Sequence, residues 1–344
     1  MLDAFSGFSS SGGGFTIVPY IMLLSLWLGA RKRQVYYTFV LSLTICVIGV
    51  GKMLYKEDRP IWINPDLTYK NDDNCANEYG NPSGHSMVGS VLAFSVLFEL
   101  LDAYKGHENK AVRNVLFALF TILAVLYSVL MALSRVVIAI HAWNQIVYGW
   151  LLGIWIAFFC KLVIQEKLYV FIDAHLLGIS LQTLKKTGIA VGLMTAFTGI
   201  QIGAFYISSL YLNKTNAEQA LMISNAQVIC EGFKTDMHSN DKSFKGIGAS
   251  NLFFGAIIGV ILQAKAFEGQ VKMSAPKEYK VLKWIGRLVV LIVMSLPFIV
   301  LLTIPLTTMW PSMLKNLVAV FFWNLTLTFL LDTVCLKLRL YDQK

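Results

Sequence analysis

The sequence predicts an all-α membrane protein, a polytopic bundle of about nine transmembrane helices. Its mean hydropathy is +0.62 and only 14% of its residues are charged, whereas a soluble domain carries about 25% charged residues. Apolar runs recur along the 344 residues. Each is close to the roughly twenty residues, rising about 1.5 Å each, that cross the hydrocarbon layer of a membrane.

The apolar runs also predict the order of the helices. The basic residues "RKR" directly follow the first run, so we interpret it as a retained helix rather than a cleaved signal. Mixed apolar and polar residues over 165–186 predict an amphipathic helix along the membrane interface. No linker rich in Pro and Gly divides the chain, which predicts one integral-membrane domain over residues 1–344. The nine predicted spans are 15–30, 36–55, 84–101, 114–133, 145–164, 188–211, 247–264, 285–306 and 316–335.

The distribution of basic residues predicts the orientation of the chain. Most of the 29 Lys and Arg residues fall on one side of the nine spans, and cytoplasmic loops are enriched in these residues. The N-terminus is therefore expected outside the cytosol and the C-terminus inside it. The net charge of +9 lies between apolar runs rather than on a basic arm, so no nucleic-acid partner is expected.

Three stretches on the outer side contain the candidate site. They are "KMLYKEDRP" at 52–60, "NPSGHSM" at 81–87 and "SRVVIAIHAWNQ" at 134–145. Taken singly, their polar residues have ordinary explanations, such as a snorkelling lysine or a histidine at a helix end. Their common face and spacing favour one site instead. Its candidate residues are Lys52, Arg59, Ser83, Gly84, His85, Arg135, His141 and Gln145.

These residue types are suited to phosphate chemistry. Arg59 and Arg135 can each form bidentate hydrogen bonds with phosphate oxygens, and Lys52 adds a point charge. Ser83 and Gly84 stand at a predicted helix N-terminus, where N–H groups and the helix dipole favour an anion. Phosphoryl transfer without a metal also needs a nucleophile and a proton donor, and two histidines can supply both.

The three motifs, K-x6-R-P, P-S-G-H and S-R-x5-H-x3-Q, resemble the signature of the type 2 phosphatidate phosphatase (PAP2) superfamily, which also includes vanadium haloperoxidases. Within it, "RPIWI", "CANEYGNPSGHSM" and the final Gln145 resemble the glucose-6-phosphatase family, since most lipid phosphatases have Asp at that last position. The nine-span layout is similar to that family as well. The resemblance implies a PAP2-like catalytic core over about 36–165 with additional spans over about 188–335, and it weakens after residue 190.

The resemblance also implies roles for the site residues. His141 resembles the nucleophile that becomes phosphohistidine, and His85 resembles the acid that protonates the leaving oxygen and later activates water. Gln145 replaces the Asp that supports the nucleophile. The cations with Ser83 and Gly84 resemble the phosphate cradle. The implied enzyme is a phosphomonoesterase that hydrolyses a glucose 6-phosphate-like sugar phosphate at the lumenal face of the endoplasmic reticulum membrane.

Two other functions remain open at this point. A lipid phosphate phosphatase would have nearly the same core, and a non-catalytic membrane subunit could keep the fold, although no motif residue is missing. The expected partners are a phosphorylated sugar or lipid and the membrane lipids, and a transporter that delivers the substrate is left open. No cofactor is expected. No metal is expected either, because Glu57 and Asp58 are interpreted as solvated carboxylates.

Two further patterns belong to the outer loops. The five cysteines contain no CxxC pair, which argues against a zinc site. The orientation places Cys75 and Cys230 on the oxidising side, where they can form a disulfide. The sequence "NKT" at Asn213 matches a glycosylation acceptor.

Overall fold

The computed structural model of the protein describes residues 31–67, 75, 78–176, 183–212, 214–230, 239–266, 281–338 and 340. Every secondary-structure element in these residues is helical, and eight of their helices are long and apolar enough to cross a membrane. The all-α multi-span fold class is therefore confirmed. These helices correspond to the second through ninth predicted spans. The first predicted span, 15–30, and Asn213 lie outside the described residues.

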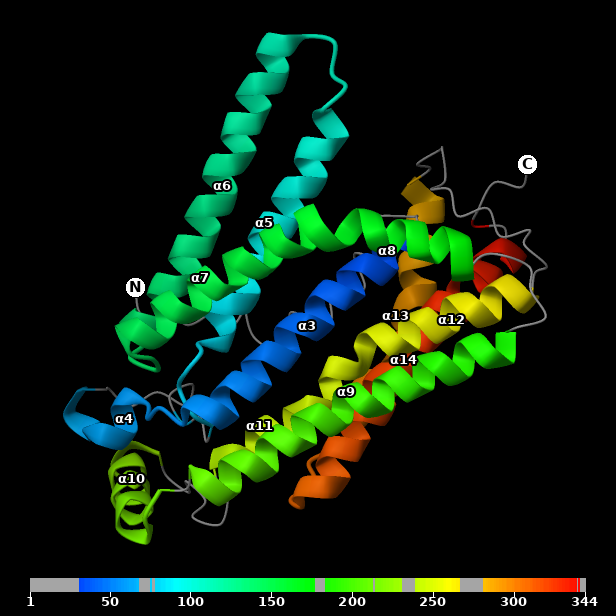
Figure 1. Ribbon diagram of the computed structural model, residues 1–344. Helices are drawn as coiled ribbons and strands as arrows, with labels where there is room; N and C mark the ends of the chain where they lie inside the picture. Colours follow the sequence, from blue (N-terminus) through cyan, green and yellow to red (C-terminus); the bar gives the residue numbers. More distant parts are fainter. Residues whose placement is uncertain are drawn as a thin grey trace. The chain divides into compact units, whose positions relative to one another are not determined.

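The helices that contain the predicted spans follow the sequence pattern with small shifts at their ends (Figure 1). In chain order they are α3 (Arg31–Tyr55), α5 (Gly84–Tyr104), α6 (Lys110–Val137), α7 (Trp143–Phe159), α9 (Thr183–Tyr211), α12 (Leu252–Ala266), α13 (Val281–Thr303) and α14 (Met309–Lys337). The short helices are α4 (Pro60–Ile63), α8 (Gln165–Phe171), α10 (Asn216–Ile229) and α11 (Ser239–Ile247).

Within the segment predicted to be an amphipathic helix, 165–186, residues 165–176 are helical and 183–186 belong to α9, and the position of the segment along the membrane interface stays a prediction. After α7 the chain continues as one helix through a π-helical stretch (Cys160–Ile164), α8 and a second π-helical stretch (Ile172–Leu176). The apolar residues of this segment are divided between two environments, because Ile172 is fully buried and Leu168 packs against the same cluster, whereas Val170 and Phe171 are 58% and 45% exposed. Residues 177–182 lie outside the described part.

The described residues form two compact units, and the division falls inside α3 and inside the helix that follows α7. Unit 1 contains Val47–Val163 and Ala204–Ser243. Unit 2 contains the part of α3 up to Cys46, together with Ile164–Gly203 and Phe244–Lys344. All the candidate site residues belong to unit 1. The single domain predicted over 1–344 stays a prediction.

In unit 1, α5 and α6 form an antiparallel helical hairpin (Figure 1). The Asn109 side chain begins α6 by accepting hydrogen bonds from the backbone N–H groups of Ala111 and Val112, at 3.0 and 3.1 Å. Helix α7 packs closely on α5, because a Cβ added at Gly149 would lie 2.6 Å from the Ser83 carbonyl oxygen. This approach brings the first turns of α5 and α7 together, and both contain site residues.

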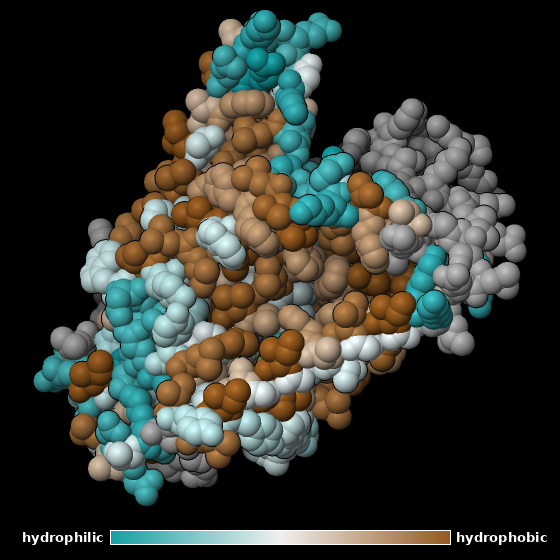
Figure 2. All heavy atoms as spheres, viewed as in Figure 1, coloured by the Kyte–Doolittle hydropathy of each residue, from teal (hydrophilic) through white to brown (hydrophobic). Residues whose placement is uncertain are grey.

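The outer flank of the α5–α6 hairpin is apolar. Val115 and Ile122 of α6 are 67% and 62% exposed, one above the other on the helix surface. Figure 2 shows apolar surface along these helices and hydrophilic residues gathered at the turn between them. Such a flank is suited to contact with lipid tails.

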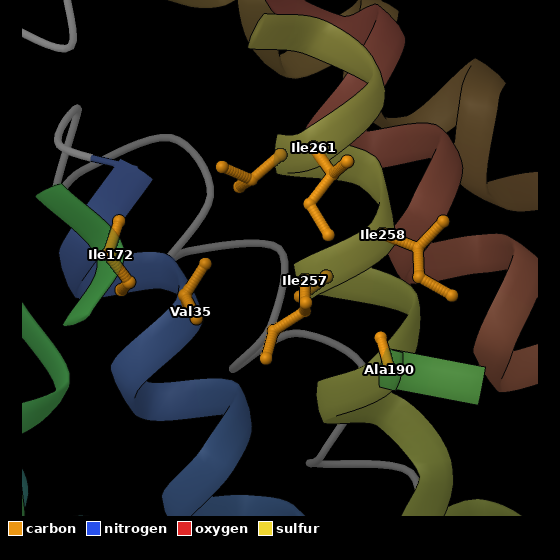
Figure 3. Packing of buried hydrophobic residues seen from close by; sticks show 8 residues of the cluster. Val35, Ile172, Ala190, Ile257, Ile258 and Ile261 are labelled. Atoms are coloured by element: carbon orange, nitrogen blue, oxygen red, sulfur yellow. The ribbon is translucent and has the colours of Figure 1, made fainter. Parts of the chain in front are cut away.

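Unit 2 is held together by packing of aliphatic side chains. Figure 3 shows the cluster formed by α3, the second π-helical stretch, α9 and α12. Beside it, the Gln201 side chain exchanges hydrogen bonds with the Ser250 hydroxyl, and Thr198 donates to Asn251 Oδ1 at 3.1 Å. The buried aliphatic residues are Val35, Ile172, Ala190, Ala256, Ile257, Ile258, Val260 and Ile261.

Candidate active site

Three cations from different elements converge in unit 1. Lys52 lies in the last turn of α3, Arg59 immediately precedes α4, and Arg135 lies in the last turn of α6. Their side chains are only 3%, 2% and 6% exposed, and all three act electrostatically on His141. Burying a charge is costly unless anions compensate it. The arrangement therefore favours an anionic ligand.

Glu78 supplies one such anion, and the sequence prediction missed it. Its Oε1 lies 2.6 Å from Lys52 Nζ and 3.6 Å from Arg59 Nη2. Its backbone carbonyl also accepts a hydrogen bond from Arg59 Nε at 2.6 Å. The neighbouring Tyr79 is buried, packs edge-on against Trp62, and has its pKa raised to about 12, mainly by burial. The packing of Tyr79 thus holds Glu78 against the two cations.

The turn between α6 and α7 presents His141. Helix α6 ends at Val137, and Ala139 adopts a positive φ of 53°. This conformation reverses the chain at a cost of about 1–2 kcal/mol for a residue with a Cβ. Ile138 and Ile140 on either side are 0% and 1% exposed. Burial of these two side chains holds the turn in place and offsets the cost.

The tautomer of His141 follows from the orientation of the Gln145 amide. Gln145 Nε2 donates to the Asp58 carbonyl at 2.6 Å, and its Oε1 accepts from the Ala142 backbone N–H at 3.3 Å. Those backbone groups fix which end of the amide faces His141. Gln145 Oε1 lies 3.2 Å from His141 Nδ1, so that nitrogen carries the proton and donates it to the amide oxygen. His141 Nε2 is then the nitrogen with the lone pair.

Arg59 lies against that lone pair. Its Nη1 is 3.3 Å from His141 Nε2 and also donates to the Ile140 carbonyl at 3.2 Å. A phosphoryl group attacked by Nε2 would therefore lie beside the Arg59 guanidinium, which can bind its oxygens. The pKa of His141 is well below its usual value of 6.5, because burial and the charges of Arg59, Arg135 and Lys52 disfavour the imidazolium. His141 is thus held neutral, which leaves the Nε2 lone pair free of a proton.

The start of α5 contributes the remaining candidates. Ser83 precedes the helix, and Gly84 and His85 form its first turn. The Ser83 backbone N–H donates to the Gln145 carbonyl at 3.1 Å, and its hydroxyl lies 3.0 Å from the Ser86 hydroxyl. Ser83 thus joins the two motif loops, and its N–H is already engaged. His85 lies close enough to Arg135, Lys52, Glu78 and Arg59 to feel their charges.

Glu57 and Asp58 are partly exposed, but they are not the freely solvated carboxylates that the sequence predicted, because both have partners. The Asp58 carboxylate pairs with the Lys214 ammonium, and Glu57 accepts hydrogen bonds from two asparagine side chains. The reason is that the loop after α3 is covered by the chain that follows α9 and by the loop before α5. The adjacent acidic residues "ED" inside the first motif were the only signal in the sequence.

Cys75 and Cys230 form a disulfide, as the sequence allowed. It ties Cys75, three residues before Glu78, to the end of α10. That helix also contacts α4, where Asn225 donates to the Trp62 and Ile63 carbonyls at 2.9 and 3.0 Å. Cys75 and the α4 residues that follow Arg59 are therefore attached to the same helix.

The part of the chain that contains this site is similar in sequence to known proteins. Residues 33–169, which contain the whole site, match the family model described as the PAP2 superfamily. This segment belongs to the PAP2 superfamily. An undecaprenyl-diphosphatase from Sulfolobus acidocaldarius is 29% identical over 153 residues, which cover 44% of this chain and 64% of that protein. The chain thus spans less than two thirds of the relative that it matches. No solved structure matches this chain.

These matches confirm the superfamily part of the predicted resemblance. The matched relative is an undecaprenyl-diphosphatase rather than a glucose-6-phosphatase, so the narrower family stays a proposal. Among the described residues, no group of three His, Cys, Asp or Glu side chains could hold a metal ion. The sequence prediction of a metal-free reaction stays a prediction.

Proposed function

We propose that this protein is a membrane phosphatase that forms a phosphohistidine on His141. One observation carries the proposal. His141 has its Nδ1 proton bonded to Gln145 Oε1 at 3.2 Å, so its Nε2 lone pair faces Arg59 Nη1 at 3.3 Å. A neutral, oriented nucleophile beside buried cations is what phosphoryl transfer requires. A non-catalytic subunit would have no need of this arrangement.

The reaction has two steps. The Nε2 lone pair attacks phosphorus, the bond from phosphorus to the leaving oxygen breaks, and His85 protonates that oxygen. Lys52, Arg59 and Arg135 stabilise the charge on the transferring oxygens. In the second step His85 takes a proton from water, the water oxygen attacks phosphorus, and the P–N bond breaks to release phosphate. Throughout, Gln145 Oε1 accepts a hydrogen bond from the Nδ1–H group and keeps the ring oriented.

The proposed substrate is a lipid-linked phosphate, such as a polyprenyl diphosphate. The name of the similar archaeal protein supports this class, and so does the surface beside the site. Tyr55 and Tyr148 are 54% and 38% exposed, and their hydroxyls lie 2.8 Å apart. Tyr55 is near Pro82, because a Cβ added at Gly51 would lie 2.7 Å from the Pro82 ring and 3.9 Å from the Tyr55 ring. A lipid chain could therefore stay in the membrane while its phosphate enters the cradle.

A sugar phosphate resembling glucose 6-phosphate is the second candidate. Gln145 favours it, because the glucose-6-phosphatase family has Gln at this position and most lipid phosphatases have Asp. In both cases we propose that the site and the N-terminus face away from the cytosol and that the C-terminus is cytosolic. The Cys75–Cys230 disulfide supports this side, because disulfides persist in oxidising compartments. The endoplasmic reticulum lumen is the proposed compartment.

One assay tests both candidates. Purified protein in detergent is given undecaprenyl diphosphate, phosphatidate or glucose 6-phosphate, and phosphate release is measured with His141→Ala as the control for contaminating phosphatases. We expect kcat/KM for the lipid-linked substrates to exceed that for glucose 6-phosphate by at least tenfold. The reverse order would favour the sugar phosphatase. No His141-dependent release from any substrate would overturn the proposed function.

A further inference from the structure

Glu57 is bonded to both loops that present the histidines. Its Oε2 accepts a hydrogen bond from Asn81 Nδ2 at 2.7 Å, and its Oε1 accepts one from Asn144 Nδ2. Its backbone carbonyl accepts a third from the Gly80 N–H at 2.8 Å. Every acceptor group of this residue is thus directed to another segment of the site.

The two asparagines lie next to the residues that position the histidines. Asn81 directly precedes the Pro-Ser-Gly-His stretch that ends in His85. Asn144 directly precedes Gln145, which holds the His141 ring. Glu57 itself is two residues before Arg59, so its carboxylate joins all three motifs.

We propose that Glu57 is a positioning residue that fixes His85 and His141 relative to Arg59. This inference rests on the proposed function and adds a residue to it. Glu57 acts through the asparagines, and its carboxylate oxygens are directed at their amides. A carboxylate suits the role because it only accepts, and both partners are N–H donors. Neither the resemblance to glucose-6-phosphatases nor the superfamily match assigns a role to this position.

The physical consequence is a precise alignment of nucleophile and acid. In-line phosphoryl transfer needs the attacking nitrogen, phosphorus and leaving oxygen nearly collinear, and a displacement of about 1 Å can lower a rate about 100-fold. The three motif segments lie at the ends of α3, α5 and α6, so their relative positions depend on the loops. The bonds of Glu57 connect those loops directly.

The test uses paired variants and phosphoenzyme formation. Glu57→Ala removes the connection, and Asn144→Asp places a second carboxylate against Glu57. Both should lower the rate of labelling from a ³²P-substrate by about 10- to 100-fold. Glu57→Gln should have a small effect, because the exposed Asn144 amide can turn its oxygen toward the new N–H group. The double variant Glu57→Gln/Asn144→Asp restores a donor–acceptor pair and should recover the labelling rate to within a few-fold of the unmodified protein.

Three readouts separate positioning from a general structural or electrostatic role. Glu218→Ala is the matched control, since it removes from the same unit a carboxylate whose hydrogen bonds within the described residues are to Thr215. Positioning predicts a lower kcat with a nearly unchanged KM, an unchanged acidic limb of the pH profile, and recovery in the double variant. A shift in the acidic limb of the pH profile, or a labelling rate that does not recover in the double variant, would overturn the positioning role. A folded Glu57→Ala protein that is labelled at the same rate as the unmodified protein would also overturn it. If the unmodified protein takes no label at all, the proposed function fails first.

Discussion

The Glu78 carboxylate lies 2.6 Å from the Lys52 ammonium and 3.6 Å from the Arg59 guanidinium, within the cradle expected for phosphate. A phosphoryl group that binds both cations has to displace this carboxylate or share them with it. If the site binds phosphate as proposed, Glu78 is an internal competitor that compensates two buried charges in the absence of substrate.

Glu78→Gln should therefore tighten the binding of anions. Removing the competing charge is expected to lower the inhibition constant of vanadate on the order of tenfold, about 1.4 kcal/mol. It should also lower the stability of the empty protein by about 1–3 kcal/mol, because Lys52 and Arg59 lose a counter-ion. Inhibition assays and thermal unfolding with and without phosphate measure the two effects. An unchanged vanadate constant would show that the carboxylate does not compete.

The two histidines should differ in their effect on the phosphoenzyme. His141→Ala is expected to abolish both turnover and acid-labile labelling from a ³²P-substrate, because no nucleophile remains. His85→Ala should slow turnover by about 100-fold or more, yet still allow labelling from a substrate whose leaving group needs no protonation. Rapid-quench labelling distinguishes them. Label that persists in His141→Ala and disappears in His85→Ala would reverse the assigned roles.

The depressed pKa of His141 predicts an unusual pH dependence. Phosphoenzyme formation from a substrate with a good leaving group should continue as the pH falls through 6.5, because the folded protein keeps His141 neutral. The same shift makes the unfolded chain bind the proton first, so the contribution of His141 to stability should decrease as the pH falls below about 6.5. Labelling rates from pH 4.5 to 8 provide the measurement.

Gln145→Glu should raise the pH at which phosphoenzyme formation begins to decline on the acidic side of the pH profile. The variant keeps the length of the side chain and places a carboxylate on His141 Nδ1, which stabilises the imidazolium. We expect the limb to move toward pH 6.5 and the labelling rate at pH 5.5 to fall. Gln145→Ala is the control, because it removes the hydrogen bond without adding a charge. A limb that stays in place in Gln145→Glu would contradict the tautomer assigned to His141.

The disulfide should stabilise unit 1 and the loop that carries Glu78. Cys75→Ser/Cys230→Ser is expected to lose about 2–4 kcal/mol of stability, as is typical when a native disulfide that closes a long loop is removed. The phosphatase activity should fall at temperatures that the unmodified protein tolerates. Cys46→Ser, outside the disulfide, is the control in thermal unfolding. Equal unfolding temperatures for the two variants would show that the Cys75–Cys230 disulfide does not stabilise unit 1.

The helices could be predicted from the sequence because membrane crossing imposes one strong constraint. A run of about twenty apolar residues has few other solutions, and the eight described spans follow those runs. The segment after residue 165 could not be predicted in the same way. Its mixed pattern fits either an interfacial face or a face buried against protein, and the structure packs Ile172 and Leu168 against other helices while it leaves Val170 and Phe171 exposed.

Some residues of the candidate site could likewise be predicted from the sequence, and others could not. Residues in the three motifs could be named because Lys, Arg and His at fixed spacing imply a chemistry. Glu57 and Glu78 could not, since an acidic residue in a loop is usually solvated and its partners are set by chain reversals far along the sequence. The hydrogen bonds from Asn81 and Asn144 to Glu57, and the position of Glu78 on Lys52, exist only once the loops are folded.

The membership of α10 in unit 1 changes what counts as a complete enzyme. The signature residues end at Gln145, yet Cys75, three residues before Glu78, is bonded to Cys230, and the Lys56 ammonium donates to the Ser208 carbonyl at 2.9 Å. A gene product that stopped after the fifth span would satisfy every signature pattern and still lack these supports. Shortened copies of such a gene would thus keep every motif while encoding chains without the contacts that attach Cys75 and Lys56 to later parts of unit 1.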